Sequence, residues 1–123
     1  MIQRYSRPAM AALFDDAARY QTWLDVEIAV TAALEKRGEA PAGTAERIRT
    51  AARVDVARID ELEETLRHDV IAFLTQIGET VGPDARYLHL GMTSSDLVDT
   101  AMALQLVRAT DLLLNEAEAL RET

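Results

Sequence analysis

Apolar residues recur every three or four positions along most of the chain, and this spacing is the feature that most limits its possible folds. The pattern is clearest at Tyr20, Trp23, Leu24, Ile28 and Leu34. Such spacing gathers apolar side chains on one face of an α-helix, whereas a half-buried strand alternates every second residue. The chain has no β-hairpin signal and no internal repeat. The sequence therefore predicts an all-α protein with five or six helices.

Capping residues and helix breakers divide the chain into these helices. Pro8 suits the first turn of a short helix, and Thr44 and Asp69 are well placed to cap later ones. Gly82–Pro83 marks the clearest turn. The predicted helices cover residues 8–14, 15–37, 44–53, 54–66, 69–81 and a last stretch from about residue 95 onward.

The last predicted helix begins near Ser95 or Asp96 and runs about 25 residues, or roughly 38 Å at 1.5 Å per residue. Neither a glycine nor a proline ends it. This is the pattern expected of a longer helix that has been cut in the middle. Its expected apolar face consists of Leu97, Ala101, Leu104, Val107 and Leu112, and continues into Leu113 and Leu120.

Composition excludes several classes of function. The chain has 123 residues, which suits one domain, and a net charge of −8, which argues against a nucleic-acid partner. It contains no cysteine, so neither a disulfide framework nor a thiolate metal site is possible. Its first ten residues contain no apolar stretch, and no apolar run approaches eighteen residues, so we expect neither a secretory signal nor a membrane span. We therefore expect no nucleic-acid partner and no membrane partner.

The two histidines, His68 and His89, both fall at predicted breaks between helices. His68 stands between Arg67 and Asp69, where the carboxylate can orient the imidazole and the guanidinium can hold an anion. A histidine at a helix boundary is also commonly a capping or surface residue. Neither histidine belongs to a metal-ligand pattern, so we expect no metal site.

Residues 93–96, Thr-Ser-Ser-Asp, allow two interpretations. Thr93 and Asp96 match the capping-box pattern, which is sufficient to explain a helix start. Alternatively, the hydroxyls and unpaired N–H groups of the helix start hold a phosphate or a carboxylate. Near the other terminus, Arg4 and Tyr5 either bind an anion or are simply solvated.

Taken together, three motifs resemble the N-terminal region of the adenylosuccinate lyase family, within the fumarase/aspartase superfamily. They are Arg4-Tyr5, Arg67-His68-Asp69-Val70, and Gly91-Met92-Thr93-Ser94-Ser95-Asp96 followed by Asp99-Thr100-Ala101. Their order, mutual spacing and helical context match, and the resemblance covers essentially the whole chain. It implies an N-terminal helical domain over residues 1–95 and the truncated start of a central-bundle helix over residues 96–123.

The resemblance also implies a chemistry. Members of this family eliminate fumarate from adenylosuccinate to give AMP, and from the succinyl-carboxamide ribonucleotide intermediate of purine biosynthesis. They use no metal or redox cofactor, and we expect a cytoplasmic homotetramer with a nucleotide substrate. By position, the implied substrate-binding residues are Arg4, Tyr5, Arg67, His68, Asp69, His89, Thr93 and Ser94, with His68 also a candidate for an auxiliary catalytic role.

Part of the family's machinery is absent from this sequence. The loop that carries the catalytic serine, the segment with the principal catalytic histidine and most of the central bundle have no counterpart here. We therefore expect the chain on its own to be inactive. Two alternatives remain open: another member of the superfamily, such as a carboxymuconate cycloisomerase, which shares the Thr-Ser-x-Asp helix start, and a non-catalytic helical interaction module.

Overall fold

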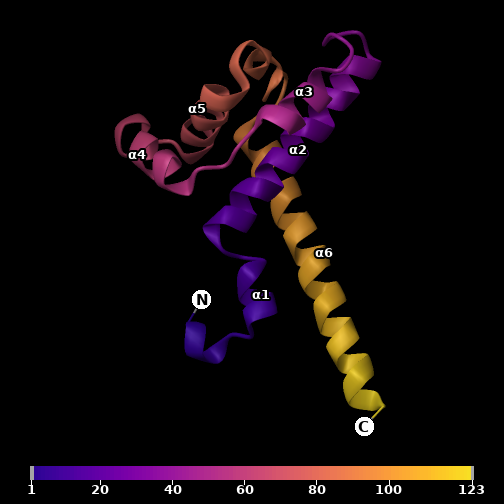
Figure 1. Ribbon diagram of the computed structural model, residues 1–123. Coiled ribbons are helices and arrows are strands. Elements are labelled where there is room, and N and C mark those ends of the chain that lie inside the picture. Colours follow the sequence, from indigo (N-terminus) through magenta and orange to yellow (C-terminus); the bar gives the residue numbers. More distant parts are fainter. Residues whose placement is uncertain (1, 123) are drawn as a thin grey trace.

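The computed structural model describes residues 2–122 and shows an all-α protein, as the sequence predicts (Figure 1). The described residues form six α-helices and two short 3-10 helices. In chain order these are η1 (Gln3–Tyr5), α1 (Pro8–Ala12), α2 (Asp16–Lys36), α3 (Thr44–Ala51), α4 (Val56–Leu66), α5 (Asp69–Val81), η2 (Gly82–Tyr87) and α6 (Ser94–Arg121).

Two long helices, α2 and α6, pack against each other and carry the other elements. Helix α3 lies along α2, while α4 packs on α5 and α5 is followed by η2 (Figure 1). The C-terminal half of α6 extends away from the main helical cluster (Figure 1). The N-terminal segment lies beside that half, where Arg7 forms an ion pair with Glu116. The cluster is therefore well packed at one end of α6 and open at the other.

An aromatic group fills the centre of the cluster. The rings of Tyr20 and Trp23 meet edge to face with centroids 5.2 Å apart, and Phe73 from α5 lies 5.4 Å from Trp23 in the same arrangement. Edge-to-face contacts of this kind stabilise a core beyond the area that they bury. All three side chains are buried, and Tyr20 and Trp23 belong to the apolar stripe that the sequence predicts.

The apolar stripe predicted for α2 is confirmed. Tyr20, Trp23, Leu24, Ile28 and Leu34 are all buried in the structure. The helix starts as predicted, because the Asp15 carboxylate accepts a hydrogen bond from the Ala18 N–H at 2.7 Å. The helix ends at Lys36, and Gly38, two residues later, has a φ of +75°.

Two predicted caps are wrong. His68, not Asp69, is the N-cap of α5, and its Nδ1 lies 3.4 Å from the Ile71 nitrogen whose N–H it accepts. Gly43, with a φ of +80°, precedes α3, and Thr44 is the first helical residue. The Thr44 hydroxyl donates to the Pro41 carbonyl, while Glu35 accepts the N–H groups of Gly43 and Ala45. Both errors arise because a neighbouring or distant side chain takes over the capping.

The apolar face predicted for α6 is confirmed only near its start. Leu97 and Ala101 are buried, but Leu104, Val107, Leu113 and Leu120 are exposed. The buried face continues instead through Gln105 and Ala109. The Gln105 amide donates to the Leu13 carbonyl at 2.7 Å, which explains how a polar residue is accommodated there. The sequence contains apolar residues on more than one side of α6, and periodicity alone did not identify which side packs on α2.

Candidate functional site

The candidate residues from the sequence lie in three separate segments. Arg67, His68 and Asp69 form the junction between α4 and α5. His89, Thr93 and Ser94 belong to the turn between η2 and α6. Arg4 and Tyr5 lie in η1, away from the other two segments.

The junction between α4 and α5 reverses the chain within two residues. Arg67 ends α4 in the left-handed conformation, with a φ of +54°, and His68 is extended. The His68 Nδ1 lies 3.6 Å from an Asp69 carboxylate oxygen, but it already accepts the Ile71 N–H, so the two side chains lie close together without a hydrogen bond between them. Both side chains are about half exposed, so the imidazole is accessible to a ligand.

Arg67 faces a crowded acidic surface. It lines a shallow depression together with Asp60, Glu63 and Glu64. These carboxylates lower the local electrostatic potential, so an anion held by Arg67 at this place must be bound against their repulsion. The expectation that Arg67 holds an anion stays a prediction.

The turn before α6 presents a group of hydrogen-bond donors. Thr93 is the N-cap, and the Asp96 carboxylate accepts the Thr93 N–H at 2.9 Å, so the predicted capping box is confirmed. The first N–H groups of an α-helix have no partner within the helix, and those at the start of α6 include Ser94 and Ser95. Together with the serine hydroxyls they form a donor set that suits a carboxylate or phosphate.

A buried carboxylate holds the turn that leads to these donors. Glu27, on α2, has a fully buried side chain, and its Oε2 accepts the His89 backbone N–H at 2.7 Å. Its Oε1 lies 2.7 Å from the His89 ring Nδ1. The turn is closed by the Met92 N–H, which donates to the His89 carbonyl at 3.2 Å. His89 is thus fixed through both its backbone and its ring.

Glu27 is a residue that the sequence analysis missed. The available signal was its position, since it lies three residues after Leu24 and one before Ile28 on the stripe predicted to be buried. A charged residue on a buried helix face needs a partner. The identity of that partner, 62 residues away in the sequence, depends on the tertiary fold.

The 3-10 helix η2, which precedes this turn, is held in place by a residue of α3. The Arg47 Nε, on α3, donates to an Asp84 carboxylate oxygen at 2.7 Å. This hydrogen bond, together with the charge of the guanidinium, holds the pKa of Asp84 below its ordinary value. The turn before α6 is therefore tied to α2 through Glu27 and, by way of η2, to α3.

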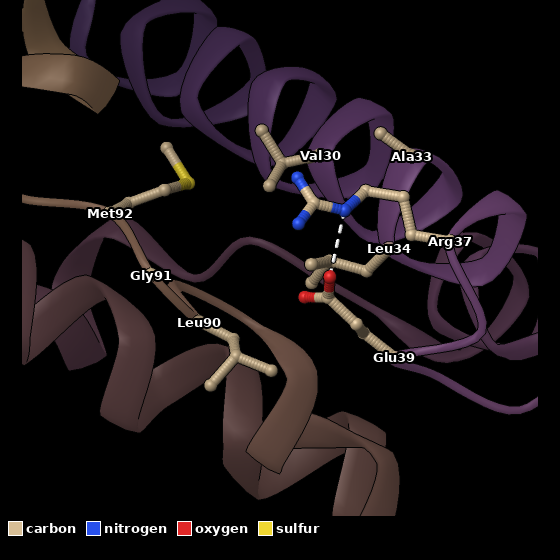
Figure 2. Close-up of a pocket in the computed structure, with 8 residues that line it drawn as sticks. All are labelled: Val30, Ala33, Leu34, Arg37, Glu39, Leu90, Gly91 and Met92. Carbon is tan, nitrogen blue, oxygen red and sulfur yellow. Dashed lines mark ion pairs between the residues drawn. The ribbon is translucent and has the colours of Figure 1, made fainter.

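A pocket of about 700 Å³ lies on the α2 side of the same turn (Figure 2). Val30, Ala33 and Leu34 of α2 form one wall, and Leu90, Gly91 and Met92 form the other (Figure 2). The charged residues at its rim, Arg37 and Glu39, pair with each other at 2.7 Å (Figure 2). Its walls are mostly apolar and its charges are paired, so this pocket is poorly suited to a phosphate.

Arg4 and Tyr5 lie far from the other candidates. The Arg4 guanidinium lies 4.9 Å from the centre of the Tyr5 ring, and the Tyr5 side chain is exposed. Tyr5 lines a pocket with Leu113, which follows Ser94 on α6 by about 28 Å at 1.5 Å per residue. This chain does not by itself bring the arginine–tyrosine pair to the serine-rich helix start.

Among residues 2–122, no group of three or more histidine, aspartate, glutamate or cysteine side chains is arranged to hold a metal ion. No helix in the described part of the chain is both long and apolar enough to cross a membrane.

Comparison with known protein families places the chain in one of them. The family model described as "Lyase" covers residues 3–123. The chain belongs to this lyase family.

Its curated relatives include adenylosuccinate lyases. The chain is 50% identical over 120 residues to adenylosuccinate lyase of Synechocystis sp., a match that covers 98% of this chain and 28% of the relative. It is 47% identical to adenylosuccinate lyase of Thermotoga maritima, with 99% of this chain and 28% of that protein covered. The chain thus spans less than a third of the length of these relatives.

Two solved structures share the fold. Fumarate lyase from Mesorhizobium sp. BNC1 superposes with a TM-score of 0.82 at 25% identity, covering 92% of this chain and 27% of that one. The 3-carboxy-cis,cis-muconate lactonizing enzyme from Pseudomonas putida gives a TM-score of 0.80 at 33% identity, covering 89% and 26%.

Proposed function

We propose that the chain forms the N-terminal part of an adenylosuccinate lyase. Such an enzyme eliminates fumarate from adenylosuccinate to give AMP, and from the succinyl-carboxamide ribonucleotide intermediate of purine biosynthesis. The observation that carries this proposal is sequence identity of 43–50% to adenylosuccinate lyases over nearly the whole chain. The chain spans only 28% of such a relative, so we expect it to contribute part of an active site and to show no turnover alone.

The reaction suits the residue types at the start of α6. A base removes a proton from the carbon next to a carboxylate, and the departing nitrogen is protonated. Negative charge builds on that carboxylate in the transition state, and fixed N–H and hydroxyl donors stabilise it. Thr93 and Ser94 supply such donors, and we assign them to the succinyl or phosphate end of the substrate.

The other candidate residues complete the proposed contribution of this chain. Arg4 and Tyr5 bind the nucleotide phosphate, and the junction residues Arg67, His68 and Asp69 contact the substrate with His89 nearby. Arg4 and Tyr5 lie far from the other candidate residues within one chain. The proposal therefore includes a homotetramer in which partner subunits complete each site. Residues 1–95 form the N-terminal domain and residues 96–123 begin the central bundle. No cofactor is required, and the enzyme acts in the cytoplasm.

A chimaera tests the activity directly. This chain replaces the matching segment of the Thermotoga maritima relative, and fumarate release from adenylosuccinate is measured. We expect the chimaera to turn over substrate and a matched chimaera with Ser94→Ala to be slower. A folded chimaera without fumarate release would overturn the proposal.

A second candidate function is that of a muconate cycloisomerase. The solved lactonizing enzyme from Pseudomonas putida, at 33% identity and a TM-score of 0.80, favours it. A substrate panel on an equivalent chimaera with that enzyme separates the two: turnover of a carboxymuconate with none of adenylosuccinate would reverse the assignment.

The remaining alternative, a helical module without chemistry, makes a different prediction. Titration of the chain with AMP, followed by NMR, shifts the resonances of Thr93, Ser94 and His68 if a partial nucleotide site is present. Unchanged spectra at high AMP would favour the module.

A further inference from the structure

Glu27 is an unusual residue for the middle of a packed helix. Its side chain is fully buried on α2 among the residues that form the core. Removing a carboxylate from water is costly unless hydrogen bonds and opposite charge compensate for it. Both compensating contacts come from one residue, His89, through its backbone N–H and its ring Nδ1, each at 2.7 Å.

His89 itself adopts a backbone conformation that side-chain-bearing residues rarely use. Its φ is +60°, in the left-handed region, which costs roughly 1–2 kcal/mol for a residue other than glycine. Such a conformation persists where surrounding contacts enforce it, and it is common at functional sites. The two contacts from Glu27 provide this enforcement and fix the direction of the ring at the same time.

The contact with Glu27 also selects the ring nitrogen that carries the proton. An ionised carboxylate only accepts hydrogen bonds, so the 2.7 Å contact to Nδ1 needs a proton on Nδ1. In the neutral imidazole the other ring nitrogen, Nε2, then keeps its lone pair. It has no hydrogen-bond partner among the described residues, and the His89 side chain keeps 19% of its surface exposed.

We infer that Glu27 is a positioning residue that holds His89 as the Nδ1–H tautomer and presents Nε2 as an acceptor at the turn that leads into the serine-rich start of α6. The acceptor takes a hydrogen bond or a proton from a ligand bound at those donors. The tautomer assignment stands on this geometry alone, whereas its use in fumarate elimination rests on the proposed function.

The wild-type chain provides the first test. Long-range ¹H–¹⁵N NMR of the histidine ring nitrogens distinguishes the two neutral tautomers, because protonated and unprotonated nitrogens resonate in separate ranges. At a pH where the ring is neutral, we expect Nδ1 protonated and Nε2 unprotonated for His89. The reverse assignment would overturn the inference, whatever any variant does.

The variant Glu27→Gln provides the second test. A glutamine has nearly the same shape, but its amide NH₂ donates, so it pairs with an unprotonated Nδ1 and moves the proton to Nε2. The expected result is a switch of the His89 tautomer. In the Thermotoga maritima chimaera, the same change should lower kcat by a factor on the order of 10² or more with little change in KM, since the ring then presents a donor in place of an acceptor.

Glu35→Gln is the matched control. Glu35 lies eight residues further along α2 and also accepts two backbone N–H groups, from Gly43 and Ala45, but it contacts no histidine. The Glu35→Gln substitution should leave the His89 tautomer and kcat unchanged, even if it lowers the stability of the fold. Equal effects of the two variants on kcat would show that Glu27 acts only as structural support and would overturn the inference. An inactive wild-type chimaera with the expected tautomer would instead count against the proposed function alone.

Discussion

Arg67 and His89 are the two non-glycine residues with positive φ in the described part of the chain, at +54° and +60°. Each lies in a segment that the sequence singled out as a candidate site. Left-handed backbone at such residues is maintained against its own cost and is concentrated at functional positions. The backbone conformations of Arg67 and His89 therefore indicate the same two segments as candidate sites, and they do so independently of the sequence motifs.

The strain at Arg67 leads to a prediction about stability. Arg67→Gly and Arg67→Ala both remove the guanidinium, but only glycine adopts a φ of +54° without steric cost. We expect the glycine variant to be the more stable of the two by about 1 kcal/mol. Urea unfolding of the two variants measures the difference. An alanine variant that is as stable as the glycine variant, or more stable, would contradict this prediction.

At this scale, sequence reasoning recognised residue types but not their partners. It identified His68 and His89 because histidines at helix breaks are visible in a linear pattern. It missed Glu27, because burial of a carboxylate becomes intelligible only when His89 is seen against it. It also chose Asp69 over His68 as the cap of α5, since aspartate is the commoner cap and the imidazole fills that place here.

The start of α6 shows how one element can serve both as a capped helix and as a binding surface. Thr93 and Asp96 satisfy each other in the capping box, so the adjacent Ser94 hydroxyl is not required for capping. Thr93 belongs to both interpretations left open by the sequence, but Ser94 belongs only to the binding surface, so mutation of Ser94 separates the two.

We expect Thr93→Ala to lower the free energy of unfolding by about 1 kcal/mol, the usual cost of losing a helix cap. Ser94→Ala should change it by less than about 0.5 kcal/mol, yet weaken the AMP-induced NMR shifts. Urea unfolding and AMP titration of the same two variants test both statements. A large loss of stability in Ser94→Ala would assign that hydroxyl to the cap.

The tie between α3 and η2 predicts a dependence of stability on pH. Arg47 lowers the pKa of Asp84 in the folded state relative to about 3.9 in an unfolded chain. The ionised form then favours folding, so this contribution is complete above about pH 3.9 and is lost as the pH falls through the lower folded-state pKa.

Asp84→Asn should therefore be less stable than wild type at neutral pH, and the gap between them should narrow as the pH falls below that range. Urea unfolding across the acid range measures the gap. Asp111→Asn, at an exposed α6 residue without an ion pair among the described residues, is the matched control and should show no such convergence.

The elements differ in how well their sequences predict them, and packing explains the difference. Helix α2 has partners on its apolar stripe, so its buried residues follow the periodicity. In α6 the same kind of periodicity extends past Ala109, where few described residues lie opposite. Periodicity reports which side chains are apolar, but burial also requires a partner surface, and that surface is not encoded in the helix itself.

On the scale of the whole molecule, the candidate residues do not converge. The serine-rich start of α6 and the arginine–tyrosine pair lie near opposite ends of that helix, about 28 Å apart along its axis. A nucleotide bound at one end cannot reach the other within one chain. The proposed activity therefore depends on the proposed homotetramer, in which residues of different subunits complete each site.

The exposed side of α6 is the surface on which such association can be tested. Leu106, Val107 and Leu114 have 54%, 58% and 57% of their surface exposed. Clustered apolar exposure on a helix is typical of an interface. We expect the chain to self-associate as its concentration rises, and Leu106→Glu to weaken association about tenfold or more, or roughly 1.4 kcal/mol.

Asn115→Glu adds the same charge at an exposed polar position and should leave association unchanged. Sedimentation velocity distinguishes these outcomes, and a wild-type chain that stays monomeric at its highest soluble concentration would contradict the expected association through this side of α6.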